Sequence, residues 1–206
     1  MFKKMALLTT LVLALALSAF APLTPAFAAA PVTTTAWSDA PALSGGSWDA
    51  IQAQATAIAR DAATVVTTSQ RIQAYAAQIQ ANENDLAVSA WAADIIALAS
   101  QTEQDAAAIV VTANEINTRI DNSEGTTLAL SDDIGAMADR IGEMADRILW
   151  TELQIGVMAD RIVESEYLIS GSSLSLARMI VASNETLSGH THRIQTAAAT
   201  IQNLLP

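Results

Sequence analysis

The sequence predicts an all-α protein, and the arrangement that it favours is an antiparallel four-helix bundle. No proline occurs between Pro41 and Pro206, and this stretch is rich in alanine, glutamine, glutamate and arginine, which are compatible with long helices. Isoleucine, leucine and valine recur there every seven residues, the period of helices that bury one face against their neighbours. Both observations concern the same stretch, so we expect the whole of it to be helical.

The N-terminal residues precede this helical region and are predicted to be an export signal followed by a tail. Two lysines lead into an apolar run that is shorter than the roughly 20 residues of a membrane span, and Ala26-Phe27-Ala28 offers a small-x-small cleavage site. We expect residues 1–28 to be a cleaved signal peptide, with cleavage after Ala21 as the alternative. We expect residues 29–46 to be a flexible tail, and residues 47–206 to be an exported helical domain, periplasmic or extracellular. No transmembrane segment is expected in the mature chain.

The first helix is predicted to start at the N-cap Ser47 and to end near residues 82–85. Its apolar column is followed by a second column that belongs to the next helix. The step from Leu86 to Ile95 moves the apolar stripe to the opposite side of a helix, at about 100° per residue, so the chain must turn between the two columns. The first column comprises Ile51, Ile58, Val65, Ile72, Ile79 and Leu86; the second comprises Val88, Ile95, Thr102, Ile109 and Ile116.

Residues 121–127 are polar and contain a glycine, which predicts the second turn. They resemble a calcium-binding loop only in part, because Gly125 stands one position early and Asp132 replaces the glutamate that such loops carry at their twelfth position. We therefore expect no calcium site there.

Two further columns follow this turn, and the boundary between them stays open. The composition of residues 170–173 indicates a turn, yet the step from Ile169 to Ile180 equals three helical turns and keeps the stripe in phase. With a turn there, four segments of similar length, roughly 50 to 60 Å each, form the bundle. The alternative is a coiled-coil hairpin of two very long helices. The columns comprise Ile134, Ile141, Ile148, Ile155, Ile162, Ile169 and Leu176, and then Ile180, Leu187, Ile194 and Ile201.

Between Ile134 and Ile162 a seven-residue word, I-G-x-M-A-D-R, occurs three times, with a degenerate copy, ILWTELQ, before the last. On a helical wheel its Ile, Met and Ala form the apolar face, Gly extends that face, and Asp and Arg line its two polar borders. The plainer interpretation, which we favour, is ordinary packing inside one bundle. The sharper hypothesis is a candidate interaction surface in which the Asp border of one molecule meets the Arg border of another, a contact that forms filaments or sheets if it does not close. The surface comprises Asp139, Asp146, Asp160, Arg140, Arg147, Arg161, Gly135, Gly142 and Gly156.

Each of these helical glycines costs about 1 kcal/mol relative to alanine, which suggests a packing reason for it. Glu143 is placed to pair with Arg147 one turn later. In the degenerate heptad, Thr151 and Glu152 take the places of Met and Ala. We expect Glu152, like Glu166, to lie at the edge of a wet interface, since the Glu-x-x-His motif of bundle metal sites is absent from the sequence.

The two histidines, His190 and His192, point to different sides of a helix. We expect a packed core residue at His190 and a surface residue at His192, and we predict neither a metal site nor a cofactor.

Composition argues against several classes of protein. The chain has no cysteine, which excludes disulfides and thiol catalysis, and beyond the predicted signal it has eight arginines, 21 acidic residues and no lysine. Nucleic acid and anionic membranes are poor partners for such a chain, because both attract dense cationic charge. No nucleophile elbow, phosphate loop or haem-attachment motif occurs, so we expect a protein that is not an enzyme.

The heptads from Ile134 to Ile162, with Val163-Glu164-Ser165-Glu166 after them, resemble those of exported, mostly uncharacterised bacterial helical proteins. More loosely, the chain is similar to the envelope proteins of sulfur globules, which implies a coat role outside the cytoplasm. We expect a structural protein that self-associates or coats a hydrophobic particle such as a sulfur globule. The alternative is a periplasmic bundle that binds a small ligand or metal between its helices.

Overall fold

The computed structural model describes residues 45–123 and 128–205, and this part of the chain consists of four helices and their connections. The helices have nearly equal lengths of 38, 36, 37 and 34 residues, so that each can pack along its whole length against its neighbours. Their bounds are Gly45–Asn82 for α1, Leu86–Asp121 for α2, Leu128–Glu164 for α3 and Gly171–Leu204 for α4. The predicted signal peptide and most of the predicted tail lie outside the described residues.

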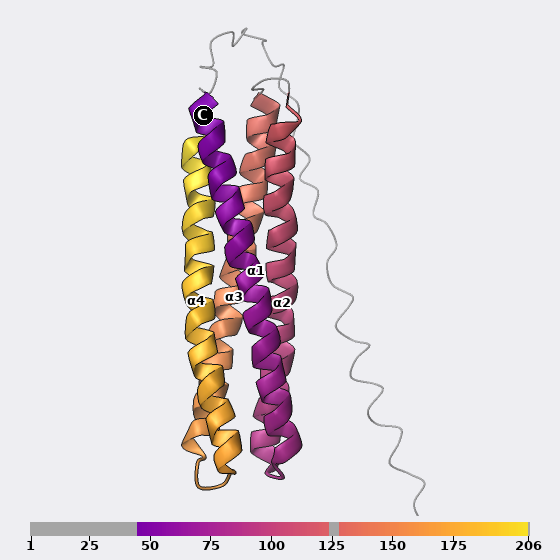
Figure 1. Ribbon diagram of the computed structural model, residues 1–206, viewed down its shortest axis with the longest axis vertical. Helices are drawn as coiled ribbons and strands as arrows, with labels where there is room; N and C mark the ends of the chain where they lie inside the picture. Colours follow the sequence, from indigo (N-terminus) through magenta and orange to yellow (C-terminus); the bar gives the residue numbers. More distant parts are fainter. Residues whose placement is uncertain (1–44, 124–127, 206) are drawn as a thin grey trace, which may run out of the picture. The chain divides into compact units, whose positions relative to one another are not determined.

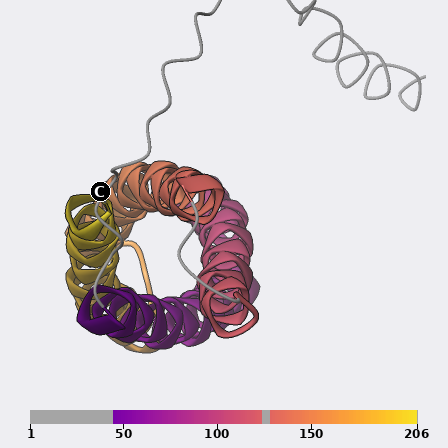
Figure 2. The same ribbon diagram turned by 90° about the horizontal axis from the view of Figure 1, so that it is seen from above.

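The helices run antiparallel and form a four-membered ring (Figures 1 and 2). The contacting pairs are α1·α2, α2·α3, α3·α4 and α1·α4. The start of α1 lies beside the end of α2, where the Gln52 amide donates to Asp121 at 2.6 Å. The four-helix bundle is thereby confirmed, and the hairpin of two long helices is wrong.

The predicted columns of aliphatic residues form the core. Isoleucine is the commonest large side chain in this core, because a β-branched side chain with few rotamers packs well between facing helices. The fully buried aliphatic members are Ile51, Ile58, Val65, Ile72 and Ile79 in α1, Val88, Ile95, Ile109 and Ile116 in α2, Ile134, Ile141, Ile148, Ile155 and Ile162 in α3, and Ile180, Leu187, Ile194 and Ile201 in α4.

The first turn falls where the sequence predicts it. Asp85 is the N-cap of α2, and its carboxylate accepts the amide hydrogens of Ala87 and Val88 at 2.9 and 3.0 Å. Leu86, assigned above to the first column, is instead the exposed first residue of α2. At the other end of α1 the helix already begins at Gly45, so Ser47 lies inside it and is not its N-cap.

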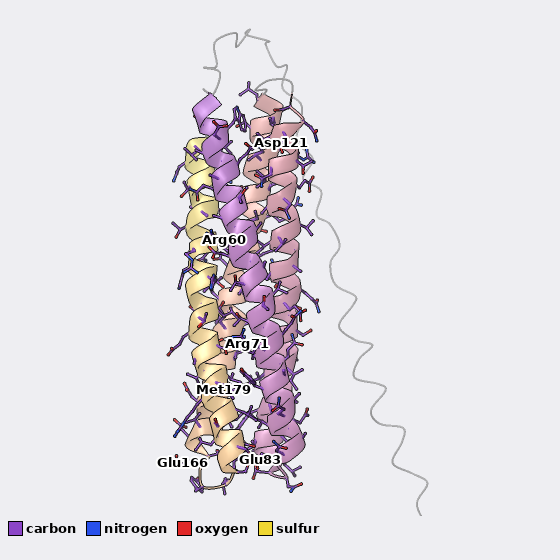
Figure 3. All side chains as sticks on the ribbon, in the orientation of Figure 1. Arg60, Arg71, Glu83, Asp121, Glu166 and Met179 are labelled. Atoms are coloured by element: carbon purple, nitrogen blue, oxygen red, sulfur yellow. The ribbon has the colours of Figure 1, made fainter. Side chains whose placement is uncertain are left out.

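The third boundary, left open by the sequence, is a turn. α3 ends at Glu164, Ser170 is the N-cap of α4, and Ile169 lies in the connection and leaves its predicted column. The Ser170 amide and hydroxyl donate to Glu83 of the first turn at 3.0 and 2.7 Å. These bonds join the two turns at one end of the bundle, where Figure 3 labels Glu83 and Glu166.

At the opposite end, α2 and α3 are held together beside the second turn. Arg119 near the end of α2 forms an ion pair with Asp133 near the start of α3 at 2.7 Å. Residues 124–127 of the predicted second turn lie outside the described residues. Among the helices that the structure describes, none combines the length and apolar character that crossing a membrane requires.

Candidate interaction surface and buried polar layer

The aspartates of the repeated word are exposed on the border of α3 that faces α4. Gln202 of α4 donates to Asp139 at 2.7 Å, and Gln195 donates to Asp146 at 2.5 Å. Asp160 is also exposed. Two of the three aspartates are therefore engaged within the molecule, although their bonds are with neutral amides and leave the negative charge uncompensated.

The arginines of the repeated word lie on the other border of α3, which faces α2. One of them pairs with a residue of α2. Arg147 forms an ion pair with Asp105 of α2 at 2.7 Å, and the Asp105 side chain is only 8% exposed. The prediction that Arg147 pairs with Glu143 is wrong, because Arg147 pairs with Asp105 instead. The buried Asp105 is the stronger partner, since its carboxylate is partly desolvated. Arg140 and Arg161 are exposed, and neither side chain has an ion pair within the described part of the chain.

The three glycines of the repeat have different surroundings. A Cβ at Gly156 would lie 3.3 Å from the amide nitrogen of Asn184, and one at Gly135 would lie 3.5 Å from Leu205, whereas one at Gly142 would meet nothing within 4 Å. The predicted packing reason therefore holds for the close approach at Gly156. It is wrong for Gly142, which borders an open groove between α3 and α4.

Inside the bundle, the degenerate heptad contributes a polar layer. The Thr102 hydroxyl of α2 and the Thr151 hydroxyl are 2.8 Å apart, and Thr151 also donates to the carbonyl oxygen of Ile148. Thr191 of α4 donates to Glu152 at 2.6 Å. The hydroxyls thus partner one another and one carboxyl group between α2, α3 and α4.

Glu152 is only 3% exposed, so its predicted place at a wet edge is wrong. The reason is that α4 packs over this heptad position and supplies the Thr191 hydroxyl. Burial raises the pKa of Glu152 to about 7, against the lowering effect of hydrogen bonds from Thr191 and Ser188. Glu166, by contrast, is exposed as expected and lies 4.0 Å from Arg178.

A cleft of about 410 Å³ between α3 and α4 reaches this carboxyl group. Glu152 Oε2 and Asn184 Oδ1 are buried there without a hydrogen-bond partner, while the Asn184 amide donates to the Glu152 carbonyl at 3.0 Å. Leu149, Leu153 and Val157 supply the apolar part of the lining. The cleft therefore places an aliphatic wall beside two buried oxygens that have no hydrogen-bond partner.

The outer side of the degenerate heptad is apolar. Trp150 is 64% exposed, Leu153 is 60% exposed and Val157 is 46% exposed, and their spacing places them on one solvent-facing stripe of α3. We call these three residues the Trp150 stripe. The sequence contains a signal for this stripe, since a helical wheel places all three apolar residues on the polar face of α3. The interaction surface predicted from the repeated Asp and Arg residues does not include the stripe.

His190 is half-buried and its predicted core position is taken by Thr191, which is fully buried. His190 Nδ1 lies 2.8 Å from Asp61 Oδ1 of α1, and Arg193 reaches the same carboxylate at 3.3 Å. Burial raises the pKa of Asp61, but the bonds with His190 and Arg193 outweigh this effect and hold it below its ordinary value. The cluster ties α1 to α4, while His192 is exposed as expected.

The fold and these contacts define the class of protein: an all-α antiparallel bundle with a polar layer inside and an apolar stripe outside. Comparison with known family models, curated proteins and solved structures gave no significant match. Within residues 45–123 and 128–205, no group of three or more His, Asp or Glu side chains is arranged to hold a metal ion.

Proposed function

We propose that this protein is an exported, non-enzymatic structural protein that self-associates through the outer face of α3. The observation that carries the proposal is the Trp150 stripe. Tryptophan is the residue type most enriched among the energetically dominant contacts of protein interfaces. An exposed tryptophan continuous with Leu153 and Val157 marks an interaction site more strongly than scattered apolar residues do.

The surroundings of the stripe support a protein partner. Asp146 and Arg147 precede it and Asp160 and Arg161 follow it, all of them exposed. An apolar centre with a charged rim is the usual anatomy of a protein–protein interface. The charges of the repeated word then serve as the rim of this contact, and the stripe supplies its centre.

The test is sedimentation velocity of the purified protein across a wide concentration range, with Trp150→Gln as the variant. We expect the wild type to form a larger species as its concentration rises, and the variant to associate at least tenfold more weakly. Val111→Gln is the matched control, because Val111 is an exposed apolar residue that lies on α2 and not on α3. A wild type that stays monomeric throughout contradicts the proposal.

Coating of a hydrophobic particle, such as a sulfur globule, is a further form of this proposal. In the closed bundle the aliphatic columns point inward, so the Trp150 stripe, and not the columns, would contact such a particle. Density-gradient fractionation of the native host tests this, since a coat protein must travel with the particles.

A second candidate function, binding of a small ligand between helices, is favoured by the cleft over Glu152. Two unpartnered acceptor oxygens beside an aliphatic wall suit a small organic amine. Butylamine at pH 8 should raise the melting temperature of the wild type and leave that of Glu152→Gln unchanged. Equal shifts in both proteins would exclude this candidate.

A further inference from the structure

Two exposed residues of opposite charge stand at equal distances along α3 from Glu152. Glu143 precedes Glu152 by the same number of residues as Arg161 follows it. The step from Glu143 to Arg161 corresponds to about five whole turns at 3.6 residues per turn, so both side chains leave the helix in the same direction. Both are exposed, and neither has an ion-pair partner within the described part of the chain.

The Trp150 stripe begins between these two charges, on the same side of the helix. Trp150 lies about 20° around the helix from the line through Glu143 and Arg161, at about 100° per residue. Trp150 and Leu153 stand on either side of the midpoint between the charges. Along the helix axis this face therefore carries an acidic residue, then apolar residues, then a basic residue.

We propose that α3 pairs with α3 of a second copy in antiparallel orientation, about a two-fold axis beside Glu152. This inference rests on the proposed self-association and specifies its partner and its geometry. The axis crosses the outer face of α3 at the height of Glu152, whose own side chain is buried on the opposite side of the helix. It places Glu143 of each copy opposite Arg161 of the other, and Trp150 of each copy against the other's Leu153. Because the contact is isologous, each favourable pair occurs twice and the assembly closes as a dimer.

The charges select this orientation over the parallel one. In a parallel, in-register pair, Glu143 faces Glu143 and Arg161 faces Arg161, and both contacts are repulsive. The antiparallel pair converts the same residues into two attractive contacts at the edge of a desolvated tryptophan. A contact of one helix from each copy is small for a permanent interface, so we expect the dimer to dissociate on dilution.

Charge reversal tests the geometry. Glu143→Arg alone and Arg161→Glu alone each place like charges at both crossings, and we expect each to weaken dimerisation at least tenfold. An equimolar mixture of these two variants restores both crossings in the heterodimer, as does the double variant E143R/R161E in its homodimer. Sedimentation velocity measures all four samples, and circular dichroism verifies that each remains helical.

Arg140→Glu is the matched control, because it makes the same charge change at an exposed arginine of α3 that lies about 80° around the helix from Trp150. We expect its dimerisation to equal that of the wild type. If the wild type associates but the mixture and the double variant do not recover, the antiparallel pairing is overturned while self-association stands. If the wild type does not associate at any concentration, the proposed function fails first.

Discussion

The second copy of the repeated word, Ile141–Arg147, and the heptad after it, Ile148–Gln154, occupy equivalent places on α3 but distribute their chemistry in opposite ways. The copy buries isoleucine, methionine and alanine and exposes a glutamate, an aspartate and an arginine. The following heptad keeps the isoleucine, buries a threonine and a glutamate, and exposes a tryptophan and a leucine. One heptad is thus amphipathic in the usual sense, and its neighbour is partly inverted.

This difference indicates that the two heptads serve different needs. The repeated word supplies apolar packing that does not specify a register, because each copy presents the same buried side chains to the neighbouring helices. The inverted heptad provides hydroxyl and carboxyl groups that must meet Thr102 and Thr191, which disfavours a shift of α3 by one heptad along its neighbours. The charged residues of the neighbouring heptads keep this helix soluble, so the outer side of the inverted heptad can carry the apolar Trp150 stripe.

The largest effect is expected from moving the buried carboxyl group into the repeated word. Ala145 is the equivalent of Glu152 one heptad earlier and is fully buried. Ala145→Glu places a carboxyl group among aliphatic side chains, so we expect a loss of about 4 kcal/mol in the free energy of unfolding. Urea denaturation measures it, with the exposed Ala136→Glu as control. A loss below that of the control would show that Glu152 needs no special environment.

The next effect is a decline in stability between about pH 4.5 and 7 that comes from Glu152. Its pKa is about 7 when folded and 4.5 in its ordinary state, so the folded protein holds the proton more tightly. The contribution of protonated Glu152 to the free energy of unfolding is fully present below pH 4.5. It falls as the pH rises to about 7, by about 3 kcal/mol in total. Urea denaturation of Glu152→Gln at pH 4.5, 6 and 8 should lack this decline, whereas the exposed Glu164→Gln should keep it. An identical decline in both variants would contradict the assignment.

The hydroxyl pair of the polar layer is expected to contribute less. Thr102→Val removes the donor to Thr151 and should cost about 1 kcal/mol, whereas T102V/T151V replaces both hydroxyls and should be nearly neutral. Thermal unfolding compares these variants with Thr118→Val, whose hydroxyl is exposed. A double variant that loses as much as the two single losses combined would show that the layer is stabilising as such.

The smallest effects distinguish two glycines of the repeated word. Gly142→Ala should gain about 1 kcal/mol, because alanine favours the helix and nothing lies within 4 Å of the added carbon. Gly156→Ala should lose most of this gain, since its Cβ meets the Asn184 amide that is bonded to the Glu152 carbonyl. Melting temperatures of both variants provide the comparison. Equal gains would mean that Asn184 moves without cost.

The sequence by itself determined the all-α class and most of the core residues. A seven-residue apolar period without proline leaves little choice but long helices packed side by side, and the change of phase after Leu86 required a turn. The serine-rich segment at residues 170–173 could not be decided in this way, because a three-turn step preserves the stripe whether or not the chain reverses. Only the Ser170 cap and its bonds with Glu83 distinguish the two.

Tertiary structure decided which polar groups lie inside. On an isolated helix Glu152 stands at the border of the apolar face, and it becomes buried only because α4 covers it and brings Thr191 within 2.6 Å. Likewise Arg147 turns to Asp105, and His190 to Asp61, because residues far away in the sequence are supplied by neighbouring helices. Periodicity records how one helix divides apolar from polar residues, whereas burial at that border depends on the partner that packs against it.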